Sequence, residues 1–285
     1  MNQPDHPSNT HRSLTMTLLG IGGAFDADLG VANTNALLEL RQGQDVIHRT
    51  LLDCGHTCGR QLQRLGLGYN DIDTVLITHT HGDHIDGLEV AGYKNLFLYQ
   101  HRCQVIATDP ILKDIWQSLS PKMSALQVAP GEVQQATLAT YLEPVSAGGA
   151  EGGLVTFADG ALTVRFVPVE HVAGMLAYAL LISFGTDTKA PTLRWSGDCT
   201  FDADSVLFKD LSAERGDLVF HDCSFYPAYP ATVHTHYDEL QTLPLKARQH
   251  TILVHHGKDD PNACADDAMR LGLAMERFVW QWDAD

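Results

Sequence analysis

The sequence is short of positive charge. Its 285 residues include 19 Lys and Arg against 35 Asp and Glu, which gives a formal net charge of −16 at pH 7. Proteins that bind nucleic acids use clustered cations to neutralise phosphates, so this balance argues against a nucleic-acid partner. The composition leaves small-molecule chemistry open.

The sequence also lacks long apolar runs and closely spaced cysteines. No run approaches the roughly 18 uninterrupted apolar residues of a membrane-spanning helix, and residues 1–13 lack the apolar core of a signal peptide. The cysteines are scattered at positions 54, 58, 103, 199, 223 and 264, unlike the dense disulfide framework of a small secreted domain. We therefore expect a cytoplasmic protein with reduced thiols and no membrane partner.

The length permits one large domain or two small ones, and we expect a single α/β unit. Residues 1–14 are predicted to be a disordered leader, and residues 15–285 a single domain. The Gly- and Ala-rich tract at 146–153 could be a linker between two domains or a loop within one. A loop is the favoured interpretation.

Short apolar runs that end in turn or ligand-type residues predict a series of strands. These strands are expected at 14–25, 34–40, 45–55, 74–77, 161–171, 176–184, 192–199, 217–225 and 250–256. Apolar residues at helical spacing predict helices at 60–72, 239–247 and 266–280, and a helical excursion at 111–142. The chain is therefore expected to be rich in strands, with helices inserted between them.

The stretch THTHGDHIDGLEVA, residues 78–91, is the most informative part of the sequence. It follows a short apolar run and contains His79, His81, Asp83 and His84. Imidazole and carboxylate groups suit zinc, manganese or iron. Two histidines two residues apart on an extended turn can reach one ion, and the next aspartate and histidine can reach a second.

The pattern His-x-His-x-Asp-His after an apolar strand resembles the metallo-β-lactamase superfamily. This resemblance implies a four-layer αββα sandwich with a binuclear site, for two divalent ions that are expected to be zinc, with manganese or iron as alternatives. The superfamily takes further ligands from later strand ends, and the chain offers His171, Asp198 and His255 in order. By analogy, metal one would be held by His79, His81 and His171, metal two by Asp83, His84 and His255, and both by Asp198 as a bridge.

Neighbouring residues leave some alternatives open. His256 competes with His255, although the alternation of the preceding strand and the superfamily pattern favour His255. Asp53 lies where this superfamily commonly places an aspartate that anchors the metal loop through hydrogen bonds. Cys54 and Cys58 could form a metal or redox pair, but without a second pair two ordinary thiols are the favoured interpretation.

The stretch VFHDCSF, followed by VHTHYDEL, resembles the phosphodiesterase branch that includes tRNase Z and the small phosphodiesterase of the carbon-phosphorus lyase pathway. The resemblance implies that Asp222 orients His234, and that His234 stabilises the phosphoryl oxygen or protonates the departing ribose oxygen. A hydroxide bridging the two ions would be the nucleophile. The predicted catalytic residues are Asp83, Asp222 and His234, with His236 as an alternative acid. tRNase Z usually has a glutamate at the position of Asp222.

Four short stretches bear on the substrate: GIGGAF, NTNALLEL, ILKDIWQSLSPK and HYDELQTLP. Together they resemble phage and bacterial enzymes of this fold that hydrolyse cyclic mononucleotides and so blunt nucleotide-signalled defence. The resemblance implies a homodimer with loops that cross between protomers, and conversion of a 3′,5′-cyclic mononucleotide to the 5′-nucleotide. A tRNase Z-like ribonuclease and a lactonase or thioesterase of the same fold are the alternatives.

The sequence does not reveal which base is preferred. Residues 92–153 are the segment where base contacts are expected, and Trp116 and Tyr141 are candidates for stacking. Aromatic residues within helical stretches are more often part of the core, so this expectation competes with a purely structural role.

Overall fold

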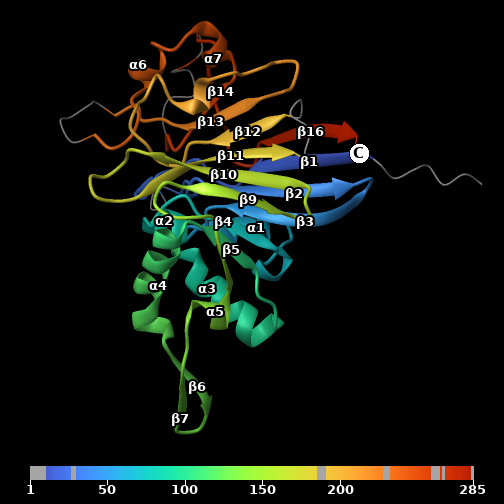
Figure 1. Cartoon of the computed structure of the whole chain (residues 1–285), viewed down its shortest axis with the longest axis vertical. Coiled ribbons are helices and arrows are strands. Elements are labelled where there is room, and N and C mark those ends of the chain that lie inside the picture. The colour runs from blue at the N-terminus through green and yellow to red at the C-terminus, as the bar shows by residue number, and fades with distance from the viewer. Residues whose placement is uncertain are drawn as a thin grey trace, which may run out of the picture.

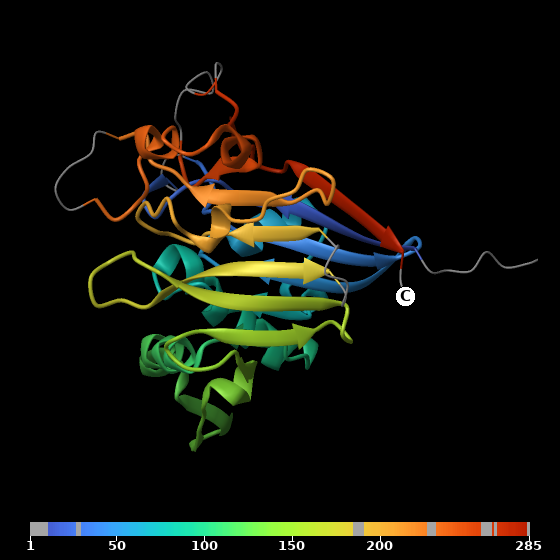
Figure 2. The same cartoon turned by 45° about the horizontal axis from the view of Figure 1, so that its top comes forward.

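The computed structural model describes residues 11–26, 30–184, 191–226, 232–257, 264 and 267–283. Two large sheets face each other and helices cover their outer sides (Figure 1). Figure 2 shows the yellow and orange strands of one sheet in front of the blue strands of the other. This arrangement confirms the predicted four-layer sandwich.

The first sheet has the strand order β16-β1-β2-β3-β4-β5-β8. Its strands are β1 (His11–Leu18), β2 (Ala36–Gln42), β3 (Asp45–Leu52), β4 (Thr74–Leu76), β5 (Gln104–Ala107), β8 (Glu143–Ser146) and β16 (Arg277–Asp283). Strands β3, β4, β5 and β8 run parallel to one another, so their carboxyl ends lie at one edge of the sheet. That edge carries the loop that follows β4.

The second sheet has the order β15-β14-β13-β12-β11-β10-β9. Its strands are β9 (Gly153–Phe157), β10 (Leu162–Val169), β11 (Ala177–Phe184), β12 (Thr192–Trp195), β13 (Leu218–Asp222), β14 (Thr251–Val254) and β15 (Arg270–Leu271). Strands β10 and β12 are both antiparallel to β11, while β12, β13 and β14 are parallel. The carboxyl ends of β10, β12, β13 and β14 therefore share one edge.

The helices belong to two groups with separate packing. The helical elements are α1 (Cys58–Arg64), η2 (Tyr69–Asp71), α2 (Gly82–Ile85), α3 (Gly87–Lys94), η3 (Asn95–Tyr99), α4 (Asp109–Met123), α5 (Leu138–Tyr141), η4 (Val206–Phe208), α6 (Tyr237–Leu240) and α7 (Leu245–Gln249). Buried residues of α1, α3, α4 and α5 join one cluster with both sheets. Residues of α6 and α7 form a second cluster with strands of the second sheet. Among the described residues, no helix has the length and apolar character needed to cross a membrane.

Alternation of apolar and polar residues explains how the strands bury one face. In β10, Leu162, Val164 and Phe166 are buried while Arg165 between them is exposed. Side chains point to opposite faces along a strand, so this spacing places the apolar set between the sheets. The tract at 146–153 connects β8 in the first sheet to β9 in the second, which agrees with a loop within the sandwich.

The helical excursion predicted at 111–142 is only partly correct. Helix α4 ends at Met123, and a hairpin of β6 (Ala125–Ala129) and β7 (Glu132–Gln135) precedes α5. Pro130 and Gly131 form the turn, where Gly131 has a φ of 80°. This left-handed backbone suits glycine in the turn that joins the two strands of the hairpin. The hairpin projects from the body of the molecule, at the bottom of Figure 1.

The helix predicted at 266–280 is wrong. The chain instead forms the short strand β15 and then β16, which pairs antiparallel with β1. Phe278 and Trp280 are buried while Val279 between them is exposed, and this period of two is a strand pattern.

Near the N-terminus, β1 begins at His11, so residues 11–14 belong to a strand rather than to the predicted leader. Residues 1–10 lie outside the described residues.

Candidate metal centre

The predicted ligands gather where the carboxyl ends of strands from both sheets meet. His79 and His81 follow β4, and Asp83 and His84 lie in α2. From the second sheet, His171 follows β10, Asp198 follows β12 and His255 follows β14. The parallel directions of these strands bring residues that are far apart in sequence to one edge. All of the predicted ligands meet there; that they bind metal ions stays a prediction.

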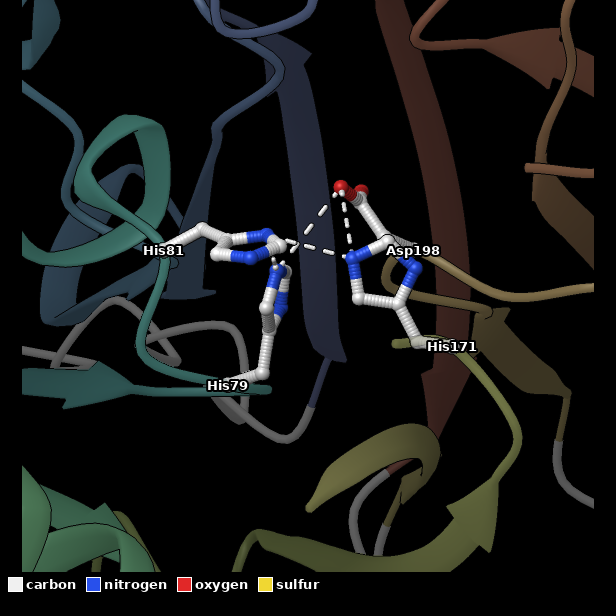
Figure 3. Close-up of side chains that lie close together, drawn as sticks. All are labelled: His79, His81, His171 and Asp198. Carbon is white, nitrogen blue, oxygen red and sulfur yellow. Dashed lines mark hydrogen bonds and ion pairs between the residues drawn. The ribbon is translucent and has the colours of Figure 1, made fainter. Parts of the chain in front are cut away.

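The first ligand group consists of His79, His81, His171 and Asp198. Figure 3 shows the three rings and the carboxylate pointing toward one another, with His79 and His81 on one segment and His171 and Asp198 on two others. Nε2 of His79 and Nε2 of His171 each lie 3.1 Å from Nδ1 of His81. Oδ2 of Asp198 is 3.7 Å from Nε2 of His79 and 3.9 Å from Nε2 of His171. Burial lowers the pKa of all three histidines, which favours neutral rings.

Hydrogen bonds behind the rings indicate which nitrogen carries the proton. Nδ1 of His171 lies 2.8 Å from the carbonyl oxygen of Val233, which can only accept, so Nε2 keeps a lone pair. Nδ1 of His79 lies 3.0 Å from Oγ1 of Thr78, whose own proton is directed to a carboxylate, so Nδ1 of His79 donates there. Both Nε2 lone pairs then face His81. A single N–H on His81 can donate to only one of these lone pairs and leaves the other without a donor, so this arrangement fits a metal ion.

The second ligand group consists of Asp83, His84, Asp198 and His255. Oδ1 of Asp198 lies 3.3 Å from Nε2 of His84 and 3.3 Å from Nδ1 of His255. Both of these nitrogen atoms are buried without a hydrogen-bond partner. Buried polar atoms are rarely left unpaired in proteins. Because both nitrogens face the same oxygen of Asp198, this arrangement also fits a bound ion.

Electrostatics at the second group favour a positive charge. Burial opposes protonation of His84, but Asp198, Asp53 and Asp83 together raise its pKa well above the usual value. Burial likewise opposes ionisation of Asp198, and the surrounding histidines, His255 and His84 foremost, nevertheless hold its pKa well below the usual range. Closely spaced buried carboxylates need compensating positive charge. A divalent cation would supply this positive charge. Zinc, manganese and iron all accept imidazole and carboxylate ligands of this kind.

Asp53 anchors the metal loop as predicted from the sequence. Its Oδ2 accepts from Nδ1 of His84 at 2.9 Å, and its Oδ1 accepts from the backbone N–H of Thr78 at 2.9 Å. The residue is fully buried and has a φ of 57°, a left-handed conformation that Asp and Asn tolerate better than most residues. Asp53 therefore orients the ring of His84 from the side away from the ligand group.

Cys54 and Cys58, close to Asp53 in sequence, are free buried thiols.

Sequence reasoning missed the residues that hold the Asp53 loop in place. Oδ1 of Asn35 accepts from the N–H of Gly55 at 3.1 Å, and Oδ1 of Asn33 accepts from the hydroxyl of Thr57 at 3.0 Å. Both asparagines are fully buried. The stretch NTNALLEL contributed only to a predicted strand and to the family resemblance, and nothing in the sequence identified its partners in the loop at 55–57.

The predicted pair of Asp222 and His234 stands beside the ligand groups. Nδ1 of His234 lies 2.8 Å from Oδ2 of Asp222 and 4.0 Å from Oδ2 of Asp198. The ring of His234 stacks on that of His255 with centroids 4.9 Å apart. Burial works against a charge on His234, but Asp222 outweighs it and raises the pKa of His234 to about 9.

The two alternative histidines occupy different positions. Nδ1 of His236 accepts from the backbone N–H of Asp238 and caps helix α6. His256 lies beside the cavity described next, but its Nε2 is within 3.2 Å of the carbonyl oxygen of Gly272. These contacts favour His234 over His236 and His255 over His256 for the predicted roles.

A cavity of about 830 Å³ opens over the ligand groups. His81, Asp83, Asp198, His234 and His255 all line it, and its volume is within the range of sites for small molecules.

The aromatic residues proposed for stacking lie outside the lining of this cavity. Tyr141 is buried with its hydroxyl donating to the carbonyl oxygen of Met123, and Trp116 packs against the core.

Comparisons with known proteins agree with this arrangement. A family model described as "Anti-Pycsar protein Apyc1" matches residues 14–279. A protein of that name from Saccharibacillus brassicae is 29% identical over 245 residues, which cover 85% of the chain and 90% of the relative. Another from Bacillus phage 010DV004 is 30% identical over 267 residues, which cover 93% of the chain and 96% of the relative.

Solved structures share the fold. The metallo-β-lactamase fold protein YhfI from Bacillus subtilis matches with a TM-score of 0.67 at 18% identity, covering 95% of the chain and 100% of that protein. A diphosphatase from the PhnP family matches with a TM-score of 0.65 at 16% identity, with coverage of 95% and 100%. Identities this low establish the fold and do not identify a substrate.

Replacing Asp53 by Asn should weaken metal binding without unfolding the loop. Asn tolerates the left-handed backbone, but it removes the charge that faces His84. Loss of such a supporting group typically lowers metal affinity about 10- to 100-fold. Competition with a chromogenic chelator would measure the change, with Asp45→Asn at the exposed start of β3 as the matched control. Equal affinity in the Asp53→Asn and Asp45→Asn proteins would show that Asp53 has no such role.

Proposed function

The chain belongs to the family described as anti-Pycsar protein Apyc1 and is a metal-dependent hydrolase of the metallo-β-lactamase fold, and we propose that it hydrolyses a 3′,5′-cyclic mononucleotide to the 5′-nucleotide. The observation that carries this proposal is the pair of Asp222 and His234 beside the two ligand groups, with His234 facing the same cavity. Divalent ions held by these groups would polarise the phosphoryl group and lower the pKa of a water molecule.

We assign the ligands as the sequence predicted them. One ion would be held by His79, His81 and His171, the other by Asp83, His84 and His255, and both by Asp198. Three groups of possible ligands lie together, and the two that share Asp198 support this assignment. The third consists of Asp222, His234 and His255, and it contains the pair that we assign to proton transfer. Zinc is our first choice of metal, because imidazole and carboxylate ligands suit it, with manganese and iron as alternatives.

His234 is the proposed acid for the leaving group. A pKa raised to about 9 keeps its imidazole protonated at neutral pH. A protonated ring can hydrogen-bond to a phosphoryl oxygen or give its proton to the ribose 3′ oxygen as the bond from phosphorus breaks. Asp222 accepts from Nδ1 of His234 and leaves Nε2 as the nitrogen that can meet the substrate. This division of roles suits a phosphodiester with a poor, alkoxide leaving group.

Several features favour a small substrate over RNA. The projecting hairpin of β6 and β7 carries the single charged residue Glu132 and no cation, so it has nothing to neutralise phosphates. The chain as a whole is acidic. We also infer a homodimer from the family resemblance and a reducing, cytoplasmic location from the free cysteines.

A substrate panel tests the proposed reaction directly. We expect turnover of at least one of cyclic AMP, GMP, CMP and UMP, since the metal groups and His234 serve a phosphodiester. The same protein should be slow on a lactone and a thioester, which do not need an acid for a ribose alkoxide. Inactivity on all four cyclic nucleotides together with fast lactone or thioester cleavage would favour the alternative hydrolase.

Metal content tests the assignment of two ions. Elemental analysis of protein purified without chelator should give about two metal ions per chain. Replacing Asp198 by Ala should remove both ions and abolish turnover, because this carboxylate faces both ligand groups. Asp202→Ala, at an exposed position after β12, is the control and should keep both. Full metal content in the Asp198→Ala protein would refute the bridging role.

Replacing His234 by Ala separates proton transfer from metal binding. The variant should keep its metal ions yet lose roughly 10²- to 10⁴-fold in rate on a cyclic nucleotide, the usual scale for one general acid. The loss should be smaller for a nitrophenyl phosphodiester, because nitrophenolate leaves without a proton. Steady-state rates on both substrates provide the measurement.

His236→Ala is the matched control for His234→Ala, because His236 lies two residues away and caps α6. It should hydrolyse both substrates at close to the parent rate. A slow His236→Ala protein beside an unaffected His234→Ala protein would transfer the role to His236. If neither variant is slow, the chain has no acid at this position.

A further inference from the structure

Phe25 is a large apolar residue that its own chain leaves in water. It is 90% exposed and lines the cavity over the ligand groups. An exposed aromatic side chain on a binding cavity can stack with a ligand ring without giving up contacts to the protein core. Exposed aromatic residues of this kind are typical of ligand-binding surfaces. A stacking surface also requires a backbone that holds the aromatic ring in place.

Described residues next to Phe25 are held by hydrogen bonds. The N–H of Gly23 donates to Oδ2 of Asp26 at 2.6 Å, and Asp26 is only 8% exposed. The carbonyl oxygen of Gly22 accepts from the N–H of Thr34 at 2.8 Å. A methyl group built on Gly23 would lie 3.0 Å from Nε2 of His255, so this loop packs directly against a proposed metal ligand. These contacts hold residues 22, 23 and 26 in place, and Phe25 between them lines the cavity.

Tyr226 is a second exposed aromatic residue of the same cavity. It is 60% exposed. The preceding residue, Phe225, turns inward and packs on Tyr237 with ring centroids 5.0 Å apart. The N–H of Ser224 donates to the carbonyl oxygen of Thr235 at 2.8 Å, which ties this segment to the one that carries His234. Tyr226 thus follows a segment after β13 that hydrogen bonds hold to the one carrying His234.

We propose that Phe25 and Tyr226 form the surface on which the nucleobase of the substrate stacks. The inference rests on the proposed function, since it takes the phosphate to lie at the ligand groups and the base to extend into the same cavity. Aromatic faces hold any base by its ring plane, and rigid aromatic residues lose little conformational entropy on binding. The two residues therefore replace Trp116 and Tyr141, which lie in or against the core, as the base-binding aromatics.

Equilibrium binding of two product-like probes tests this surface. AMP has a base and ribose 5-phosphate does not, so calorimetry of both with the protein as purified isolates the contribution of the base. Phe25→Ala and Tyr226→Ala should each weaken AMP binding about 5- to 150-fold, the range measured for loss of one stacking partner. Both variants should bind ribose 5-phosphate like the parent. Phe25→Trp, which keeps an aromatic face, should keep AMP affinity.

Phe97→Ala is the matched control, because Phe97 is also exposed, at 58%, but lies on η3 outside the cavity lining. It should leave the binding of both probes unchanged. Parent protein that binds AMP no more tightly than ribose 5-phosphate, or Phe25→Ala and Tyr226→Ala proteins with full AMP affinity, would overturn the proposal. Failure of the proposed function would show separately, as absence of cyclic nucleotide hydrolysis by the parent protein.

Discussion

The carboxylate of Asp198 is the group around which the site is arranged. It is 2% exposed, and its two oxygen atoms face different sets of histidines, His84 and His255 on one side and His79 and His171 on the other. Burying a carboxylate costs several kcal/mol unless opposite charge and hydrogen bonds compensate. The surrounding rings have their outer nitrogens already paired where Thr78, Asp53 and Val233 accept from them. The remaining nitrogens point inward, so cations at this position would satisfy the carboxylate and the rings together.

Strand direction makes this convergence possible. The proposed ligands come from the segments after β4, β10, β12 and β14, and the proposed acid His234 comes from the segment that follows β13. Because those strands end at one edge, the segment after β4 supplies four of these side chains and the loops after β10, β12 and β14 each need to supply only one. The rigid sheets fix the positions of the ligands, while longer loops outside them, with Phe25 and Tyr226, supply the walls of the cavity. Our proposals thus assign the chemistry and the recognition of the substrate to different parts of the fold.

Local spacing made part of this arrangement readable from the sequence. His79, His81, Asp83 and His84 lie within one turn, and their pattern led to the correct fold. The partner of His171 could not be read in this way, because it is the backbone carbonyl of Val233, distant in sequence. The segment at 266–280 was misread because its apolar residues fit a helix as well as a strand, and only pairing with β1 decided between them. The aromatic residues of the cavity were missed because their position depends on how distant loops meet.

Hydrolysis in ¹⁸O-labelled water is the most direct measurement of the proposed chemistry. With a 3′,5′-cyclic nucleotide as substrate, we expect only the 5′-nucleotide, with one ¹⁸O atom in its phosphate, as seen by ³¹P NMR and mass spectrometry. That result requires water to attack phosphorus and the ribose 3′ oxygen to leave with a proton. Metal ions at the ligand groups would serve the first step and His234, which lines the same cavity, would serve the second. A 3′-nucleotide product, or label in the ribose instead of the phosphate, would contradict this assignment of the site.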